Sequence, residues 1–250
     1  MQPWIEASWP APPGVSAITT TRAGAGVSQP PFAAFNMGLR SGDEVAAVLE
    51  NRRQLQQRLA LPSAPHWLRQ VHGVQVAQIT AAASGDGDAP EADAAVTCLR
   101  AQVLAILTAD CLPVVLAACD GSEIAAAHAG WRGLAAGVLE RTLAAMQTPP
   151  QHLRAWLGPA ASARHYEIGT EVRDAFIGQD AAAAACFTAT VPGHWKADLY
   201  ALARQRLIAS GMSADAIYGG EHCTIEEADT FYSYRRDGHT GRMVTLVWMS

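Results

Sequence analysis

The chain has 250 residues, of which 50% are apolar, and its formal net charge at pH 7 is −5. A chain of this length and composition can bury a sizeable core, and the lack of a dense Lys/Arg stripe argues against a nucleic-acid partner. The longest apolar stretch, Val103 to Cys119, is interrupted by Asp110 and Pro113, so we expect two core strands there and no membrane span.

The first elements expected along the chain are a strand, a long loop and a helix. Val15 to Thr20 is predicted as a strand, and the polar, glycine-rich stretch Thr21 to Gly42 as a loop whose length is often a sign of function. Glu44 to Leu59 carries apolar residues at helical spacing and is predicted as a helix that ends before Pro62.

Two further strands are expected at Val74 to Ile79 and at Ala92 to Thr97. The polar segment between them contains Asp86 and Asp88 and is followed by Glu91, and three carboxylates so close together could bind calcium. The rest of an EF-hand loop is missing, so we interpret this segment as a solvated loop.

An Asp120-Gly121 pair between two apolar runs predicts a β-hairpin. The two runs are Pro113 to Cys119 and Glu123 to Ala127. Counting away from the two-residue turn places Pro113 opposite His128. Cys111 then lies within about two residues of facing His128, a separation that the first shell of one metal ion could bridge at about 2.0–2.3 Å per ligand.

The second half of the chain alternates helices with short strands. The predicted helices are Leu134 to Met146, Gly169 to Phe176 and Asp198 to Ser210, and the predicted strands are Ala155 to Leu157, Ala216 to Tyr218 and Met243 to Trp248. No internal repeat or linker is visible. We therefore expect one α/β domain of mixed α+β type over residues 1–250, with a mixed sheet core surrounded by helices.

Cysteine usage and the first residues bear on the compartment. The five cysteines are odd in number and irregularly spaced, and the chain opens without a basic and then apolar leader. These features predict a cytoplasmic protein in a reducing compartment. We also expect a monomer or a small homo-oligomer.

The hairpin brings two zinc-type ligands together, Cys111 and His128, and His72 is the favoured third. His72 is followed by Gly73, where we expect a helical stretch to end and a loop to begin. A His/Cys/His set leaves the fourth tetrahedral position open, as in catalytic zinc sites. The same residues also fit a buried apolar cysteine and ordinary polar histidines, and their spacing matches no short zinc signature. The pattern alone leaves both interpretations open.

Ten short runs, in order along nearly the whole chain, match one bacterial family. They are Thr20-Thr21-Arg22, Asn36-Met37-Gly38, Gln70-Val71-His72-Gly73, Ala92-Asp93-Ala94, Thr108-Ala109-Asp110-Cys111-Leu112-Pro113-Val114, His128-Ala129-Gly130-Trp131-Arg132-Gly133, Leu157-Gly158-Pro159, Tyr166-Glu167-Ile168-Gly169, Cys223-Thr224 and Tyr234-Arg235-Arg236-Asp237-Gly238. The chain thereby resembles the family known variously as purine nucleoside phosphorylase, polyphenol oxidase or laccase-domain protein, and peptidoglycan editing factor. It departs from the family pattern at Ala23 and Ala25, where glycine is favoured, and at Met37, where leucine is usual.

The resemblance implies a metal site and a set of reactions. His72, Cys111 and His128 would be the ligands of Zn²⁺, with copper as the alternative metal. The reactions would be phosphorolysis of adenosine, inosine and S-methyl-5′-thioadenosine, giving the free base and ribose 1-phosphate or its methylthio analogue, and deamination of adenosine. A purine nucleoside and phosphate would then be the partners, with no nucleic acid and no membrane.

Candidate catalytic residues follow from these reactions. Zinc with an open position lowers the pKa of bound water to about 7, and a nearby carboxylate can shuttle the proton during attack on C6 of adenine. Asp110, next to Cys111, is the nearest carboxylate in sequence, although it could equally cap a loop. Arg132, just before the helix expected from Gly133, and Arg22, in the long polar loop, are candidate phosphate ligands, as against ordinary surface salt bridges.

Three other functions are alternatives to a purine nucleoside phosphorylase. A copper-dependent polyphenol oxidase would need several histidine-rich clusters, and eight scattered histidines without His-X-His pairs do not supply them. An amidase-type hydrolase that edits peptidoglycan precursors could use the same zinc chemistry on an amide. A non-catalytic interaction protein would leave an open metal site beside arginines unexplained.

Overall fold

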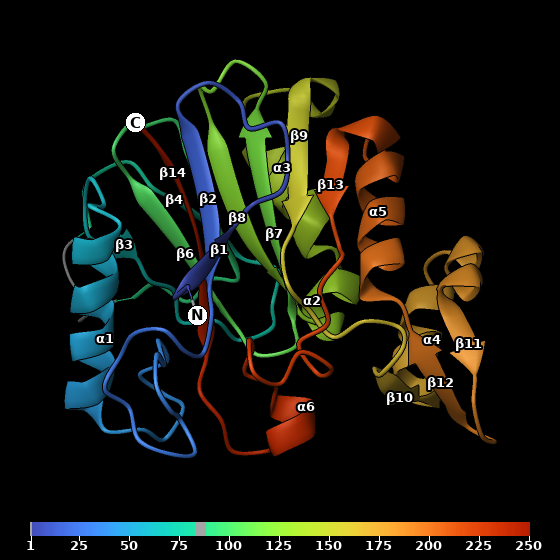
Figure 1. Cartoon of the computed structure of the whole chain (residues 1–250). Coiled ribbons are helices and arrows are strands. Elements are labelled where there is room, and N and C mark those ends of the chain that lie inside the picture. The colour runs from blue at the N-terminus through green and yellow to red at the C-terminus, as the bar shows by residue number, and fades with distance from the viewer. Residues whose placement is uncertain (1, 84–88) are drawn as a thin grey trace.

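The computed structural model describes residues 2–83 and 89–250, whose strands form three sheets (Figure 1). In order across the five-stranded sheet, the strands are β1 (Trp4–Glu6), β2 (Val15–Thr20), β14 (Met243–Met249), β6 (Val103–Thr108) and β3 (Pro65–His66). The six-stranded sheet comprises β13 (Ile217–Gly219), β9 (Leu153–Leu157), β7 (Leu112–Ala118), β8 (Ile124–Ala129), β5 (Ala94–Thr97) and β4 (Val76–Gln78). The three-stranded sheet comprises β10 (Glu167–Gly169), β12 (His194–Ala197) and β11 (Phe187–Ala189).

Helices cover the outer faces of the two larger sheets (Figure 1). Their bounds are α1 (Val45–Arg58), α2 (Trp131–Ala136), α3 (Val138–Ala145), α4 (Thr170–Ile177), α5 (Leu199–Ala209) and α6 (Tyr234–Asp237). Short 3₁₀ helices span Pro150–His152, Ala181–Cys186 and Ala214–Ala216. None of the helices in the described part of the chain is long and apolar enough to cross a membrane.

The two larger sheets pack face to face, because successive side chains of a strand point to opposite faces. In β7, Val115 and Ala117 point into the core between the sheets, where they meet Leu104 and Ile106 of β6. Val114 and Leu116 point the other way, into the core shared with α3 and α5. On the far side of the five-stranded sheet, Leu55 of α1 packs beside Phe35 and Met37. The fold is mixed α+β as predicted, and its sheet core is divided into two packed sheets.

The predicted hairpin is confirmed. Gly121 takes a positive φ of 74° and its N–H donates to the carbonyl of Ala118 at 2.9 Å, closing the turn. In the antiparallel pairing of β7 with β8, Pro113 lies opposite His128. The Asp-Gly turn therefore set the register from which Cys111 was expected to lie near His128.

Glycine divides the helix that was predicted from Leu134 to Met146. Gly137 has a φ of 95°, a left-handed conformation that ends α2 and starts α3. The prediction of one continuous helix was wrong at this residue. Helix α2 also begins earlier than expected, at Trp131, so Arg132 lies inside its first turn.

A second correction concerns the segment before His72. No helix occurs among described residues 60–75, so the predicted helical stretch ending at His72 is wrong. His72 instead sits in a turn with a φ of 61°. Strand β4 is shorter than predicted, and β1, β3, the small sheet and α6 had no prediction. Of the acidic segment weighed for calcium, Asp86 and Asp88 lie outside the described residues.

Candidate metal centre

His72, Cys111 and His128 converge at one end of the β7–β8 hairpin. Their ligand atoms all lie within 4.8 Å of one another, and Nε2 of His72 is 3.7 Å from Sγ of Cys111. The two imidazole centroids are 4.7 Å apart. His128 is buried on β8, Cys111 is half-buried just before β7, and His72 is exposed in its turn. The structure thus brings together the three predicted ligands, with one side open to solvent.

Asp93 orients two of these ligands at once. Its carboxylate, which is fully buried, accepts a hydrogen bond from Nδ1 of His128 at 2.8 Å. It also accepts the backbone N–H groups of Val71, His72 and Gly73, at 3.2, 2.9 and 2.7 Å. The bond to Nδ1 leaves Nε2 of His128 available as a ligand atom, and the backbone bonds fix the turn that carries His72. Carboxylates often orient metal-binding histidines in this way.

Electrostatics favour a deprotonated Cys111. Burial alone would raise the pKa of the Cys111 thiol, but the adjacent imidazoles of His128 and His72 outweigh it and hold that pKa below its ordinary value. Burial would lower the pKa of His128, but the charge of Cys111 and the bond to Asp93 outweigh it and hold that pKa above its ordinary value. The lowered pKa of Cys111 favours a negatively charged sulfur, which is the form that binds a metal ion.

Gly130 leaves room beside the ligands. A Cβ at this position would lie 2.8 Å from Cδ2 of His72 and 2.9 Å from Sγ of Cys111, although the backbone of Gly130 is ordinary (φ −63°). Glycine is needed here for space and not for its conformational freedom. The two imidazoles and the thiol that meet beside Gly130 fit a zinc-type ion bound by three protein ligands.

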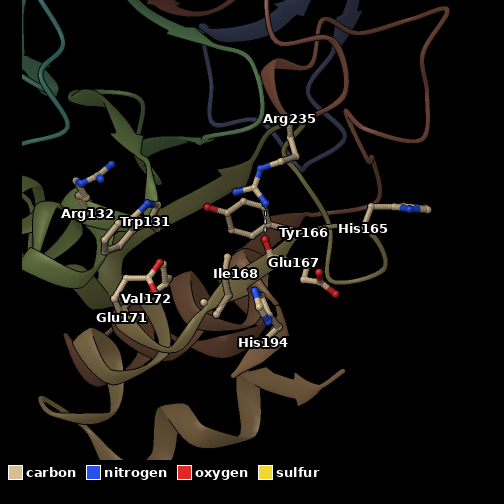
Figure 2. A pocket seen from close by; sticks show the side chains of 11 residues that line it. Trp131, Arg132, His165, Tyr166, Glu167, Ile168, Glu171, Val172, His194 and Arg235 are labelled. Carbon is tan, nitrogen blue, oxygen red and sulfur yellow. Dashed lines mark hydrogen bonds between the residues drawn. The ribbon is translucent and has the colours of Figure 1, made fainter. Parts of the chain in front are cut away.

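A cavity of about 520 Å³ opens next to the residues that follow Gly130 (Figure 2). Trp131 and Arg132 line it from α2, Tyr166 and Ile168 from the segment around β10, and Arg235 from α6. Glu167, Gly169, Glu171, Val172, His165 and His194 complete the lining. Its volume lies in the range of small-molecule sites, about 300–1,000 Å³.

Two arginines and two aromatic rings form adjoining pairs on the cavity wall. The guanidinium carbon of Arg132 lies 4.4 Å from the centroid of Trp131, and that of Arg235 lies 4.7 Å from the centroid of Tyr166. Figure 2 shows Arg235 reaching over the Tyr166 ring, where it also donates to the carbonyl of Glu167. Burial raises the pKa of Tyr166 to about 12, and the negative charge of Cys111 adds to the shift.

Asp110 is buried and ties three segments together. Its carboxylate accepts hydrogen bonds from Oγ1 of Thr224 at 2.7 Å and from the backbone N–H of Arg235 at 2.6 Å. Its backbone carbonyl accepts the N–H of Ala161 at 2.9 Å. With a φ of 95°, Asp110 forms the bend between β6 and β7. It thus holds the start of the segment that carries Arg235 next to Cys111.

Arg22 lies outside the cavity that Arg132 and Arg235 line. Its guanidinium donates to the carbonyl of Ala228 at 3.0 Å, lies 3.9 Å from the carboxylate of Asp237 and 5.1 Å from the Tyr232 centroid. It does not belong to the cavity lining. These contacts anchor the early loop to residues 228–237, which include α6.

Sequence reasoning gave no role to three residues of this region: Asp93, Tyr166 and Arg242. Burial lowers the pKa of the Arg242 guanidinium, and the charges of Cys111 and Asp110 oppose that shift, which places Arg242 in the field of the metal ligands. Asp93 and Tyr166 both occur in runs that match the family. A buried carboxylate that orients a histidine was the available signal for Asp93, but its partners lie 20 to 35 residues away.

Comparison with known sequences gives one family. A family model described as multi-copper polyphenol oxidoreductase laccase matches residues 16–250. A purine nucleoside phosphorylase of Xylella fastidiosa strain 9a5c is 56% identical over 98% of this chain and 97% of its own length. Purine nucleoside phosphorylase YfiH of Escherichia coli K12 is 47% identical over the full length of both chains. Purine nucleoside phosphorylase PA4543 of Pseudomonas aeruginosa is 46% identical over 100% of this chain and 99% of its own.

Two solved structures have the same fold as this chain. The crystal structure of Neisseria meningitidis protein NMB0706 has a TM-score of 0.93 with this chain at 46% identity and covers both chains completely. YlmD from Geobacillus stearothermophilus has a TM-score of 0.91 at 31% identity, covering 99% of this chain and 96% of its own.

Proposed function

The chain belongs to the family described as multi-copper polyphenol oxidoreductase laccase, in which its relatives are named purine nucleoside phosphorylase, and from that premise we propose that it is a zinc-dependent purine nucleoside phosphorylase. Adenosine, inosine and S-methyl-5′-thioadenosine are the proposed nucleosides, with phosphate as the second substrate. The observation that carries the proposal is the position of the His72/Cys111/His128 centre next to a cavity lined by two arginines and two aromatic rings.

The metal would be held by His72, Cys111 and His128. Bound there, zinc supplies a Lewis acid with an open coordination position at neutral pH, the chemistry that hydrolytic deamination of adenosine requires. Copper is the alternative metal, because thiolate and imidazole ligands also bind it. The described residues offer one other cluster of three potential ligands, so they do not supply the several histidine-rich sites of a multicopper oxidase.

Phosphorolysis needs a binding site for phosphate and a binding site for the purine. In this proposal Arg132 and Arg235 bind the phosphate dianion through charge-assisted hydrogen bonds, and Trp131 and Tyr166 flank the flat base. One phosphate oxygen then forms the bond to C1′ as the bond from C1′ to N9 breaks, and the departing base takes up a proton. The products are the free base and ribose 1-phosphate.

Asp110 contributes in two ways to the proposed chemistry. Through its hydrogen bond to the backbone of Arg235, it positions a phosphate ligand beside the metal centre. As the carboxylate adjacent to Cys111, it is also the group assigned to take the proton from water when adenosine is deaminated to inosine and ammonia. For Arg22, the contacts with Ala228 and Tyr232 support an anchoring role in place of the phosphate-binding role expected from the sequence.

The test uses the full chain loaded with a defined metal. Adenosine is incubated with and without phosphate, and the products are separated by chromatography. We expect adenine and ribose 1-phosphate when phosphate is present, and inosine when it is absent. His128→Ala should lose both reactions, while Cys119→Ser, an exposed cysteine away from the centre, should keep both. Absence of every product at high protein concentration would contradict the proposal and favour an amidase acting on peptidoglycan precursors.

A further inference from the structure

A second group of metal-binding side chains lies outside the centre described above. His165, Cys223 and Glu226 each offer one ligand atom, and these atoms all lie within 4.8 Å of one another. Nε2 of His165 is 3.5 Å from Oε2 of Glu226. Cys223 is fully buried, whereas the side chains of His165 and Glu226 are 41% and 43% exposed. A buried thiol therefore lies beneath an imidazole and a carboxylate that solvent can reach.

The donor set is that of a borderline-soft metal ion. Zinc combines thiolate sulfur, imidazole nitrogen and carboxylate oxygen at about 2.0–2.3 Å, which puts ligand atoms about 3.3–3.8 Å apart in a tetrahedron. The separation between His165 and Glu226 already falls in that range. It is comparable to the 3.7 Å between His72 and Cys111 in the first centre. We propose that His165, Cys223 and Glu226 form a second zinc-binding site, with water as the fourth ligand.

Two segments far apart in sequence meet at this site. Cys223 pairs with Ala160 in an isolated parallel bridge, and the N–H of Thr224 donates to the carbonyl of Ala160 at 3.0 Å. His165 follows in the turn closed by Ser162, directly before Tyr166. Zinc here would add a link between the turn that carries Tyr166 and the segment 223–226.

The site connects to the first centre through one residue. Thr224, next to Cys223, donates from Oγ1 to the carboxylate of Asp110, which adjoins Cys111. His165 also belongs to the cavity lining (Figure 2). The role that follows is structural: an ion at this site holds one rim of the cavity in place. This inference does not depend on the reaction proposed for the cavity.

Arg164 forms an ion pair with Glu226 and so competes with a metal ion for this carboxylate. Its guanidinium lies 2.5 Å from Oε2 of Glu226, the carboxylate oxygen that also faces His165. A metal ion and this guanidinium compete for the same negative charge. Removal of Arg164 should therefore strengthen metal binding, by up to about fivefold, because exposed ion pairs of this kind contribute little. A cluster that binds no metal ion would show no such gain.

The experiment isolates the second site with the full-length Cys111→Ser variant, whose first centre lacks its thiolate. Metal-free protein is titrated with Co²⁺, whose thiolate complexes absorb strongly in the near ultraviolet. We expect one Co²⁺ per chain with a thiolate band, tighter binding in Cys111→Ser/Arg164→Ala, and a rise in thermal midpoint on adding Zn²⁺. The thiolate band and the rise in thermal midpoint should both disappear in Cys111→Ser/His165→Ala.

Two controls separate binding from misfolding. Cys111→Ser/Cys186→Ser and Cys111→Ser/His194→Ala remove a cysteine and a histidine that do not belong to the cluster, and both should retain the Co²⁺ band. His165 and Glu226 are exposed, so their substitution tests the site without opening the core. Failure of Cys111→Ser to bind Co²⁺, or an unchanged band after loss of His165, would overturn the proposal.

Discussion

The carboxylate of Asp93 accepts a hydrogen bond from Nδ1 of His128 at 2.8 Å, and the same carboxylate fixes the backbone turn of His72. One buried side chain thus sets the orientation of two ligands from different parts of the sequence. The stability of the metal centre should depend on Asp93 although it binds no metal itself.

Asp93→Asn should lower zinc affinity at the first centre by about tenfold to a hundredfold, the usual effect of losing such an orienting carboxylate. Competition with a chromophoric chelator measures this affinity in a Cys223→Ser background, where only the first centre is counted. Asp174→Asn, on the exposed face of α4, is the matched control and should change nothing. Equal affinities in the two variants would mean that Asp93 serves the fold alone.

Gly130→Ala should weaken the first centre by steric displacement of both His72 and Cys111. The added methyl would meet the two ligands at 2.8 and 2.9 Å, closer than real Cβ contacts allow. Zinc affinity and activity should both fall, while circular dichroism stays unchanged. Gly238→Ala adds a methyl with nothing within 4 Å, so it should keep zinc affinity despite some backbone strain at its φ of 68°. Retained affinity in Gly130→Ala would show that the ligands adopt another arrangement.

Arg132→Ala should harm phosphorolysis more than deamination, because deamination uses water in place of the anion. A hydrogen bond to a charged group contributes about 1.5–3 kcal/mol, so phosphorolysis should fall by about tenfold to a hundredfold. Initial rates of both reactions on adenosine give the comparison, with Arg141→Ala, at an exposed position of α3, as control. An equal loss of both activities, with zinc content unchanged, would assign Arg132 to the nucleoside or to the metal environment.

Arg22→Ala decides between an anion-binding and an anchoring role. Its contacts with Ala228, Asp237 and Tyr232 predict a loss of about 1–2 kcal/mol in the free energy of unfolding. They also predict that phosphorolysis and deamination change in parallel. Denaturant unfolding and the two rates test this. A selective loss of phosphorolysis with normal stability would restore the phosphate role expected from the sequence.

Local signals explain what could be predicted of the site. The Asp120-Gly121 turn and the apolar runs on either side of it fixed which residues face one another, so Pro113 was correctly placed opposite His128. The position of His72 could not be obtained in this way. Its turn is held by Asp93, a carboxylate about twenty residues further along the chain, and not by a helix end.

The rest of the fold depends on contacts between distant segments. The apolar stretch Val103 to Cys119, interrupted by Asp110 and Pro113, predicted the two core strands β6 and β7, but it could not show that they belong to different sheets. The cavity combines α2, β10 and α6, and the short helix α6 carries no apolar repeat that would reveal it. Arg242 is brought near Cys111 by the pairing of β14 with β6, in which Met243 lies opposite Thr108.

The place of β14 between β2 and β6 has a consequence for biosynthesis. Thr19 and Thr245 share a hydrogen bond at 2.7 Å across 226 positions of sequence. During synthesis β2 is made well before β14, so the edge of β2 that pairs with β14 stays unpaired until β14 has been made. Pairing between segments so far apart slows folding, and until it forms, the unpaired backbone groups of the β2 edge can pair with other chains. Loss of Met243–Met249 should therefore divide the five-stranded sheet between β2 and β6 instead of shortening it at one edge.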